Sequence, residues 1–156
     1  MNRIKGLWVA LGLILVFSMG LLTVGQVIAA GQGYGASETK IVRVYGAFDK
    51  EPMVRIEPDL LWVGRGSTVV WSNMSQAEIK VNFPKGEECK KATAAMINWG
   101  LGAEGCLITQ QDIAPGGTTS ALFKDVGRYD YEIEYVGKNM KEKGVIEVRT
   151  EPGTLY

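Results

Sequence analysis

The stretch VRIEPDLLWVGRGSTVVWSN, residues Val54–Asn73, contains the pattern that decides the fold. Two short apolar segments meet at Pro58, and a turn at Gly64–Gly66 leads into a third segment. In that segment the large apolar residues Val69 and Trp71 alternate with smaller side chains, which is typical of a strand with one buried face. The stretch therefore predicts three short strands separated by a proline and a glycine turn.

The rest of the chain continues this pattern on both sides. Further strands are predicted at Ile41–Tyr45, at Ile79–Phe83 and on either side of the Pro115–Gly117 turn, and a last one at Gly144–Glu151. Seven to eight short strands separated by glycine and proline turns indicate an all-β sandwich.

One segment, Glu87–Gly100, departs from the strand pattern. Its alanines and Met96 favour a helix, and Gly100 is a suitable C-terminal stop. We therefore expect one short helical insertion in the sandwich.

The 156-residue chain contains no histidine. This excludes Ser-His-Asp and Cys-His nucleophilic sites, His-ligated zinc and the usual general base near neutral pH. The 17 basic and 17 acidic residues balance, and residues 31–156 contain 15 basic and 17 acidic ones. We expect no binding to nucleic acid, which needs a clustered basic face.

The N-terminus combines basic residues, Arg3 and Lys5, with a long apolar run that ends in small side chains. This is typical of a signal peptide, although Gly6–Ile28 is also long enough for an uncleaved membrane anchor. Both alternatives place the domain in the periplasm or outside the cell. The expected organisation is a signal or anchor at 1–30, a flexible leader at 31–39, one domain at 40–150 and a tail at 151–156.

Two cysteines, Cys89 and Cys106, follow this export segment. An even number of cysteines in an oxidising compartment predicts one disulfide, which would stabilise the fold by about 3 kcal/mol. The alternative is a pair of metal-binding thiolates, which would need reducing conditions or further ligands.

Two segments resemble the cupredoxin family. VRIEPDLLWVGRGSTVVWSN is similar to that family's opening strands, and DIAPGGTTSALFKDVGRYDYEI, Asp112–Ile133, is similar to its late signature of P-G, F and G-x-Y-x-Y. The resemblance covers roughly residues 41–149, with 85–105 as an insertion. It implies a cupredoxin-like Greek-key β-sandwich.

The same resemblance locates the positions of the copper ligands. The first histidine corresponds to Ile79, the thiolate to Ile133, the second histidine to Val136 and the axial methionine to Met140. A blue-copper site needs a thiolate and two imidazoles, and aliphatic side chains donate no electron pair. The resemblance therefore implies the fold without its copper or electron transfer, and we expect no cofactor.

Two other groups of residues have functional alternatives. Met53, Met74, Met96 and Met140 include soft ligands for Cu(I), but they are scattered, and packing or surface roles are the alternative. Asp130, Glu132 and Glu134 share one face of a strand. That face is either solvated or an acidic docking stripe opposite Lys141 and Lys143.

The insertion has an apolar surface at Met96, Ile97 and Trp99. These residues either close the end of the sandwich where copper would lie, or contact a partner with Trp99 as the anchor.

Together the patterns predict an exported, non-catalytic, structural or protein-binding module, such as an accessory subunit of an envelope complex. An electron-transfer protein with an atypical copper site, or an enzyme that uses carboxylates in a cleft, are the alternatives.

Overall fold

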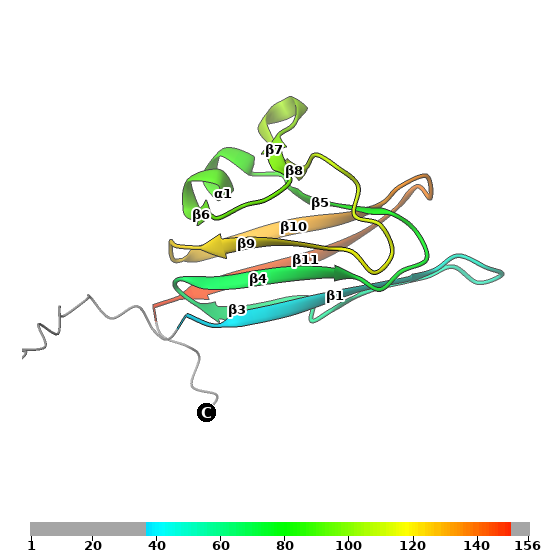
Figure 1. Ribbon diagram of the computed structural model, residues 1–156, viewed down its shortest axis with the longest axis horizontal. Coiled ribbons are helices and arrows are strands. Elements are labelled where there is room, and N and C mark those ends of the chain that lie inside the picture. Colours follow the sequence, from blue (N-terminus) through cyan, green and yellow to red (C-terminus); the bar gives the residue numbers. More distant parts are fainter. Residues whose placement is uncertain (1–36, 151–156) are drawn as a thin grey trace, which may run out of the picture. The chain divides into compact units, whose positions relative to one another are not determined.

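The computed structural model describes residues 37–150, which form a two-layer β-sandwich (Figure 1). Sheet A has the strand order β2-β1-β4-β9-β6, and sheet B has the order β3-β11-β10-β5-β8-β7. The elements are β1 (Thr39–Ala47), β2 (Met53–Glu57), β3 (Leu60–Gly64), β4 (Ser67–Asn73), β5 (Ile79–Phe83), α1 (Gly86–Ala92), β6 (Thr93–Ala94), β7 (Trp99–Leu101), the 3₁₀ turn η1 (Ala103–Gly105), β8 (Leu107–Thr109), β9 (Thr118–Phe123), β10 (Gly127–Tyr135) and β11 (Met140–Arg149). The predicted sandwich is confirmed, and the strands beyond the predicted seven to eight are the short pieces β6, β7 and β8.

The predicted organisation extends beyond the described residues at both ends. The expected signal or anchor at 1–30 and the tail at 151–156 lie outside the described residues. Part of the leader expected at 31–39 also lies there, but Thr39 already belongs to β1 and the Ser37 hydroxyl donates to Gly66 O at 2.9 Å. No helix within residues 37–150 is long and apolar enough to span a membrane.

Two parallel pairs give the sandwich its Greek-key connections. β1 pairs in parallel with β4, and β3 pairs in parallel with β11, while the other ladders are antiparallel. β2 and β3 follow each other in sequence but lie at the edges of opposite sheets. Pro58 lies between them and has no N–H to continue a ladder, so the chain changes sheet there.

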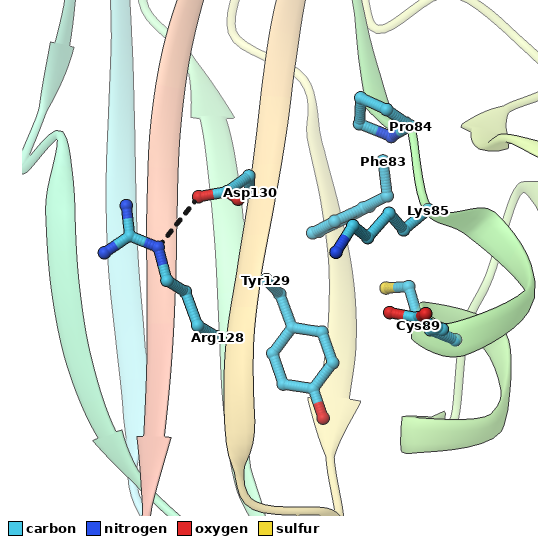
Figure 2. A pocket seen from close by; sticks show the side chains of 8 residues that line it. Phe83, Pro84, Lys85, Cys89, Arg128, Tyr129 and Asp130 are labelled. Atoms are coloured by element: carbon cyan, nitrogen blue, oxygen red, sulfur yellow. Dashed lines mark hydrogen bonds and ion pairs between the residues drawn. The ribbon is translucent and has the colours of Figure 1, made fainter.

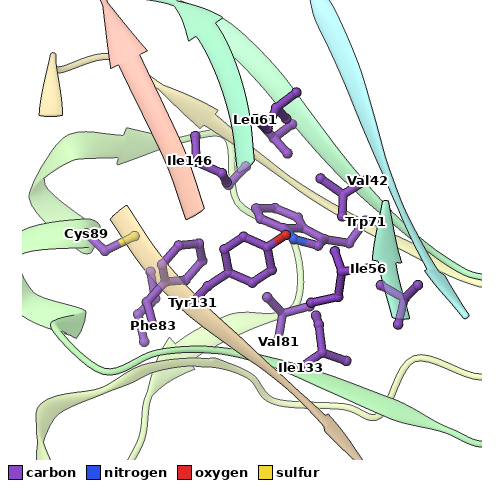
Figure 3. Close-up of a cluster of buried hydrophobic side chains, with 14 of the residues drawn as sticks. Val42, Ile56, Leu61, Trp71, Val81, Phe83, Cys89, Tyr131, Ile133 and Ile146 are labelled. Atoms are coloured by element: carbon purple, nitrogen blue, oxygen red, sulfur yellow. The ribbon is translucent and has the colours of Figure 1, made fainter. Parts of the chain in front are cut away.

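The core depends on the ring of Trp71, which is fully buried in the middle of β4 (Figure 3). Its ring lies 5.9 Å from that of Phe83 on β5, 5.6 Å from Tyr131 on β10 and 5.6 Å from Trp99 on β7. These edge-to-face contacts add about 0.5–1.5 kcal/mol each to the burial of the rings. One side chain of sheet A thus contacts both sheet B and the insertion.

The helical insertion is shorter than predicted. α1 ends at Ala92, and the following Thr93 and Ala94 pair with Phe123 and Leu122 of β9. The prediction that the helix continues through Met96 was therefore wrong. The Thr93 hydroxyl donates to Cys89 O at 2.7 Å, which satisfies a carbonyl of the last turn and allows the helix to stop.

Strands β10 and β11 approach each other closely at Gly144. Gly144 on β11 is opposite Tyr131, and a Cβ at Gly144 would touch Cζ and the hydroxyl oxygen of the tyrosine ring. That hydroxyl and Trp71 Nε1 lie together in the buried core (Figure 3).

We expect Gly144→Ala to lower the free energy of unfolding by roughly 1–3 kcal/mol through overpacking, as measured by urea denaturation. Removing the hydroxyl with Tyr131→Phe should restore part of this loss in the double variant. Lys143→Ala, an exposed neighbour on the same strand, is the control and should change stability little. Simple additivity of the two core substitutions would contradict the contact.

Candidate functional site

The four positions that correspond to copper ligands lie near the end of the sandwich where the β10–β11 hairpin turns (Figure 1). Ile79 and Met140 are the cross-strand partners of Tyr135, on β5 and β11 respectively. Val136 follows Tyr135, and its N–H donates to Glu78 O at 2.9 Å. Ile133 lies two residues before Tyr135, on the same inward face of β10. The structure therefore brings these positions together around Tyr135.

Tyr135 fills this end of the sandwich. Its side chain is 1% exposed, its hydroxyl donates to Tyr45 O at 2.7 Å, and its ring lies 5.4 Å from that of Phe48. Gly46 makes room for both rings, since a Cβ there would lie 2.8 Å from each of them. Nothing in the sequence distinguishes Tyr135, because it alternates with acidic residues in the same way as Tyr131.

The side chains at this end do not fit a blue-copper site. Ile79 and Ile133 are fully buried aliphatic residues, Val136 is aliphatic as well, and none of them has an electron pair to donate. Met140 supplies a thioether, but it is half-buried against the core. The sequence has no histidine, and residues 37–150 contain no group of three or more His, Cys, Asp or Glu arranged to hold a metal.

A hydrogen-bonded loop next to Tyr135 holds this end in place. The buried Asn73 amide donates to Ala77 O at 2.8 Å and to Ile113 O at 2.7 Å. Its carbonyl oxygen accepts from both the N–H and the hydroxyl of Ser75. Ile113 also bridges Ile79 through two backbone hydrogen bonds. Asn73 thus fixes the loops between β4 and β5 and before β9 without any metal.

The predicted disulfide is not formed in the structure, in which Cys89 and Cys106 are both free thiols. Cys89 is buried in the core cluster, where burial raises the pKa of its thiol to about 12 despite the opposing effect of Thr93. The Cys106 thiol instead lies against Gly102 and contacts Ala103 O at 3.4 Å. The two sulfur atoms therefore have different surroundings, although α1 packs against β8, the strand that follows Cys106.

The insertion covers the side of the sandwich, not the end with the ligand positions. Trp99 packs on Trp71 and on Phe83, at the far end of β5 from Ile79, and its Nε1 donates to Ser120 O at 3.0 Å. Met96 also packs against the core. Of the three predicted contact residues, only Ile97 projects fully, with 77% of its surface exposed.

The acidic residues of β10 are paired with cations on the same face. Lys141 Nζ lies 3.7 Å from Glu134 and 3.9 Å from Glu132, and Lys143 Nζ lies 3.7 Å from Glu132. Asp130 is paired with Arg128 at 3.1 Å. This is the arrangement of a solvated strand face with cross-strand ion pairs, each contributing about 0–1 kcal/mol.

A hollow of about 180 Å³ lies between α1 and β10 (Figure 2). Its lining residues are Phe83, Pro84, Lys85, Glu88, Cys89, Arg128, Tyr129 and Asp130. Its charged lining consists of two cationic and two acidic side chains.

Comparisons with known proteins find solved structures of amicyanin variants. Among solved structures, a reduced Cu(I) form of an amicyanin variant is 20% identical over 71% of this chain and 82% of that chain, with a TM-score of 0.44. The Cu(I) form of a second amicyanin variant is 21% identical over the same shares, with a TM-score of 0.45. An oxidised third variant is 21% identical over 69% of this chain and 80% of that one, with a TM-score of 0.43.

These similarities are too low to support any argument about function, and the fold follows from the strand order described above. The chain is a cupredoxin-like Greek-key β-sandwich without the residues of a type 1 copper site. No family model matches the sequence. No curated protein matches it either.

Two buried groups, the Tyr135 hydroxyl and the Cys89 thiol, make the stability of the fold depend on pH. Burial, and secondly Glu142, raise the pKa of Tyr135 to about 12, and burial raises that of Cys89 to the same value. The unfolded chain releases these protons near pH 9–10, whereas the native protein keeps them, so stability is complete below that range and falls as the pH rises toward 12.

We therefore expect the urea midpoint to be constant from pH 7 to 8.5 and to fall steadily from pH 9 to 11. Tyr135→Phe should cost about 1 kcal/mol at pH 7, through the lost hydrogen bond to Tyr45 O, and should make the alkaline fall shallower. An equally steep fall in the variant would show that Tyr135 does not contribute to it.

Proposed function

We propose that this chain is an exported, copper-free, cupredoxin-like domain that acts as a non-catalytic protein-binding module, such as an accessory subunit of an envelope complex. The observation that supports this most is the end of the sandwich, where the positions that the resemblance gives to copper ligands include the buried aliphatic residues Ile79 and Ile133, packed around the buried Tyr135. The basic and apolar sequence of residues 1–30 supports export to the periplasm or cell surface. Under this proposal, the outer surface of the domain binds a partner protein.

The exposed apolar side chains support a binding role. They are Ile41, Met53, Leu60, Trp62, Met74, Ile97, Leu101 and Val126. Single exposed apolar residues are ordinary, but groups of them mark interaction surfaces. Since Trp99 packs in the core, Trp99→Ala would disturb folding, and it is not a clean test of binding.

Chemical crosslinking of the full chain in native membranes tests the binding role. We expect one or a few proteins to be recovered, and the main one, once identified and purified, should bind the full chain in detergent at a fixed stoichiometry. Chain unfolded in urea and passed through the same recovery is the control for non-specific adhesion. Failure of every purified candidate to bind would remove the protein-binding function.

A second candidate function, Cu(I) binding at an atypical site, rests on two methionines that line one hollow. Met53 and Met74, far apart in sequence, line the same hollow of about 250 Å³ at the end of sheet A. Two thioethers are soft donors that suit Cu(I), so this hollow is the place for an atypical copper site.

Metal titration separates the two candidates. Under the main proposal, the full chain binds neither Cu(II) nor Cu(I) stoichiometrically and shows no intense blue band. Stoichiometric Cu(I) binding that disappears in the Met53→Leu, Met74→Leu double variant would favour the second candidate. Met140→Leu is the matched control, because this half-buried thioether lies outside the hollow.

A further inference from the structure

The outer faces of the two sheets differ in chemistry. The outer face of sheet B carries many charged side chains, most of them in ion pairs, next to the exposed Leu60 and Trp62 of its edge strand β3. On sheet A, the central strands β4 and β9 have no charged residue on their outer face. The outward residues of those strands are Thr68, Val70, Ser72, Thr118, Ser120 and Leu122. Sheet A therefore presents the less strongly hydrated of the two faces.

An apolar row crosses the outer face of sheet A. Ile41 of β1 is directly opposite Val70 of β4 and is 47% exposed. Leu122, two residues beyond the partner of Val70 on β9, is on the same side. These side chains form a flat surface that costs little to dehydrate.

At the end of this face lies the hollow shared by Met53 and Met74, which we call the Met hollow. Met53 pairs with Ala47 at the end of β1, and the Met74 N–H donates to Val44 O at 2.8 Å, so β1 brings both residues together. Tyr45 and Arg55 line it as well, with the guanidinium 5.0 Å from the centre of the tyrosine ring. Met53 is 63% and Met74 56% exposed.

The composition of the Met hollow is that of an interface core. Tyr, Met and Arg are enriched at the centre of protein–protein interfaces, whereas Lys, Glu and Asp are depleted there. The volume of about 250 Å³ is below the roughly 300 Å³ at which small-molecule pockets begin, and it suits a single inserted side chain.

The charge on this face indicates the chemistry of the partner. Arg43 is exposed and forms no ion pair among the described residues, since its cross-strand neighbour Glu57 is bound to Arg55 at 3.2 Å. A second copy of the chain packed through this face about a two-fold axis would bring the unpaired Arg43 residues onto one interface. A carboxylate on a different protein would instead complement Arg43.

The edge of sheet A favours docking on the face over addition of a strand. β2 is the edge strand next to β1, is only five residues long, and is flanked by Pro52 and Pro58. Short edge strands and prolines limit pairing with a further strand.

We propose that the outer face of sheet A, centred on the Met hollow, is the surface that docks the partner protein. The partner inserts an aliphatic or aromatic side chain between Met53 and Met74 and places an acidic residue opposite Arg43. This inference rests on the proposed protein-binding function and specifies its surface.

Selection of phage-displayed random peptides on the immobilised full chain in mild detergent tests the surface. We expect enriched peptides to contain an apolar residue next to Asp or Glu. In fluorescence anisotropy, Met74→Glu should weaken their binding at least tenfold, whereas Met74→Leu should leave it unchanged. Arg43→Glu should select peptides with Lys or Arg in place of the acidic residue.

Lys143→Glu on the outer face of sheet B is the matched control, and Ile97→Glu tests the insertion. Unchanged thermal midpoints establish that the variants are folded. Peptides that are insensitive to Met74→Glu but lost in Ile97→Glu would overturn this surface and leave the protein-binding function standing. Self-association of the chain that Met74→Glu abolishes would assign the face to a second copy and overturn the inference. Absence of any specific peptide would overturn the inference, and the crosslinking experiment would still decide the proposed function independently.

Discussion

The packing of the Trp71 ring is the contact on which the rest of the structure depends. It lies in the central region of sheet A and touches Phe83 and Tyr131 of sheet B and Trp99 of the insertion. Because interiors are close-packed, a ring in contact with three others fixes the spacing of the sheets and the position of the insertion together. The insertion is thus part of the core, and this leaves Trp99 without the freedom of an interface anchor.

At the end of the sandwich, Tyr135 provides what a metal would otherwise provide. A bound ion connects loops by coordinating side chains from several strands, whereas here the hydroxyl of Tyr135 reaches β1 and the amide of Asn73 connects two loops. Both devices satisfy buried polar groups with neutral partners and need no charged ligand. The end can therefore be apolar and stable at once.

Period-two alternation was sufficient to predict the strands around Trp71 and the buried row Ile79, Val81, Phe83, because one face of each strand is simply apolar. The helix extent failed because alanines favour a helix locally, while Thr93 and Ala94 pair with β9, a partner distant in sequence. The Met hollow could not be predicted either. It exists only because β1 lies between the start of β2 and the end of β4, which is a property of the fold.

The outer faces of the two sheets differ in how strongly their side chains are hydrated. On sheet B, the ion pairs between β10 and β11 are exposed, and their charged groups remain hydrated. These pairs therefore contribute little to stability, and the hydrated charges oppose non-specific association. On sheet A, the outward Ser and Thr side chains of β4 and β9 have short chains with little entropy to lose, and the neighbouring apolar groups gain from dehydration. Burying the central strands β4 and β9 of sheet A against another protein would therefore separate fewer charges from water than burying sheet B. Under the proposed docking, this difference would direct association to one face, and Arg43, which has no ion pair among the described residues, would favour partners with a complementary carboxylate.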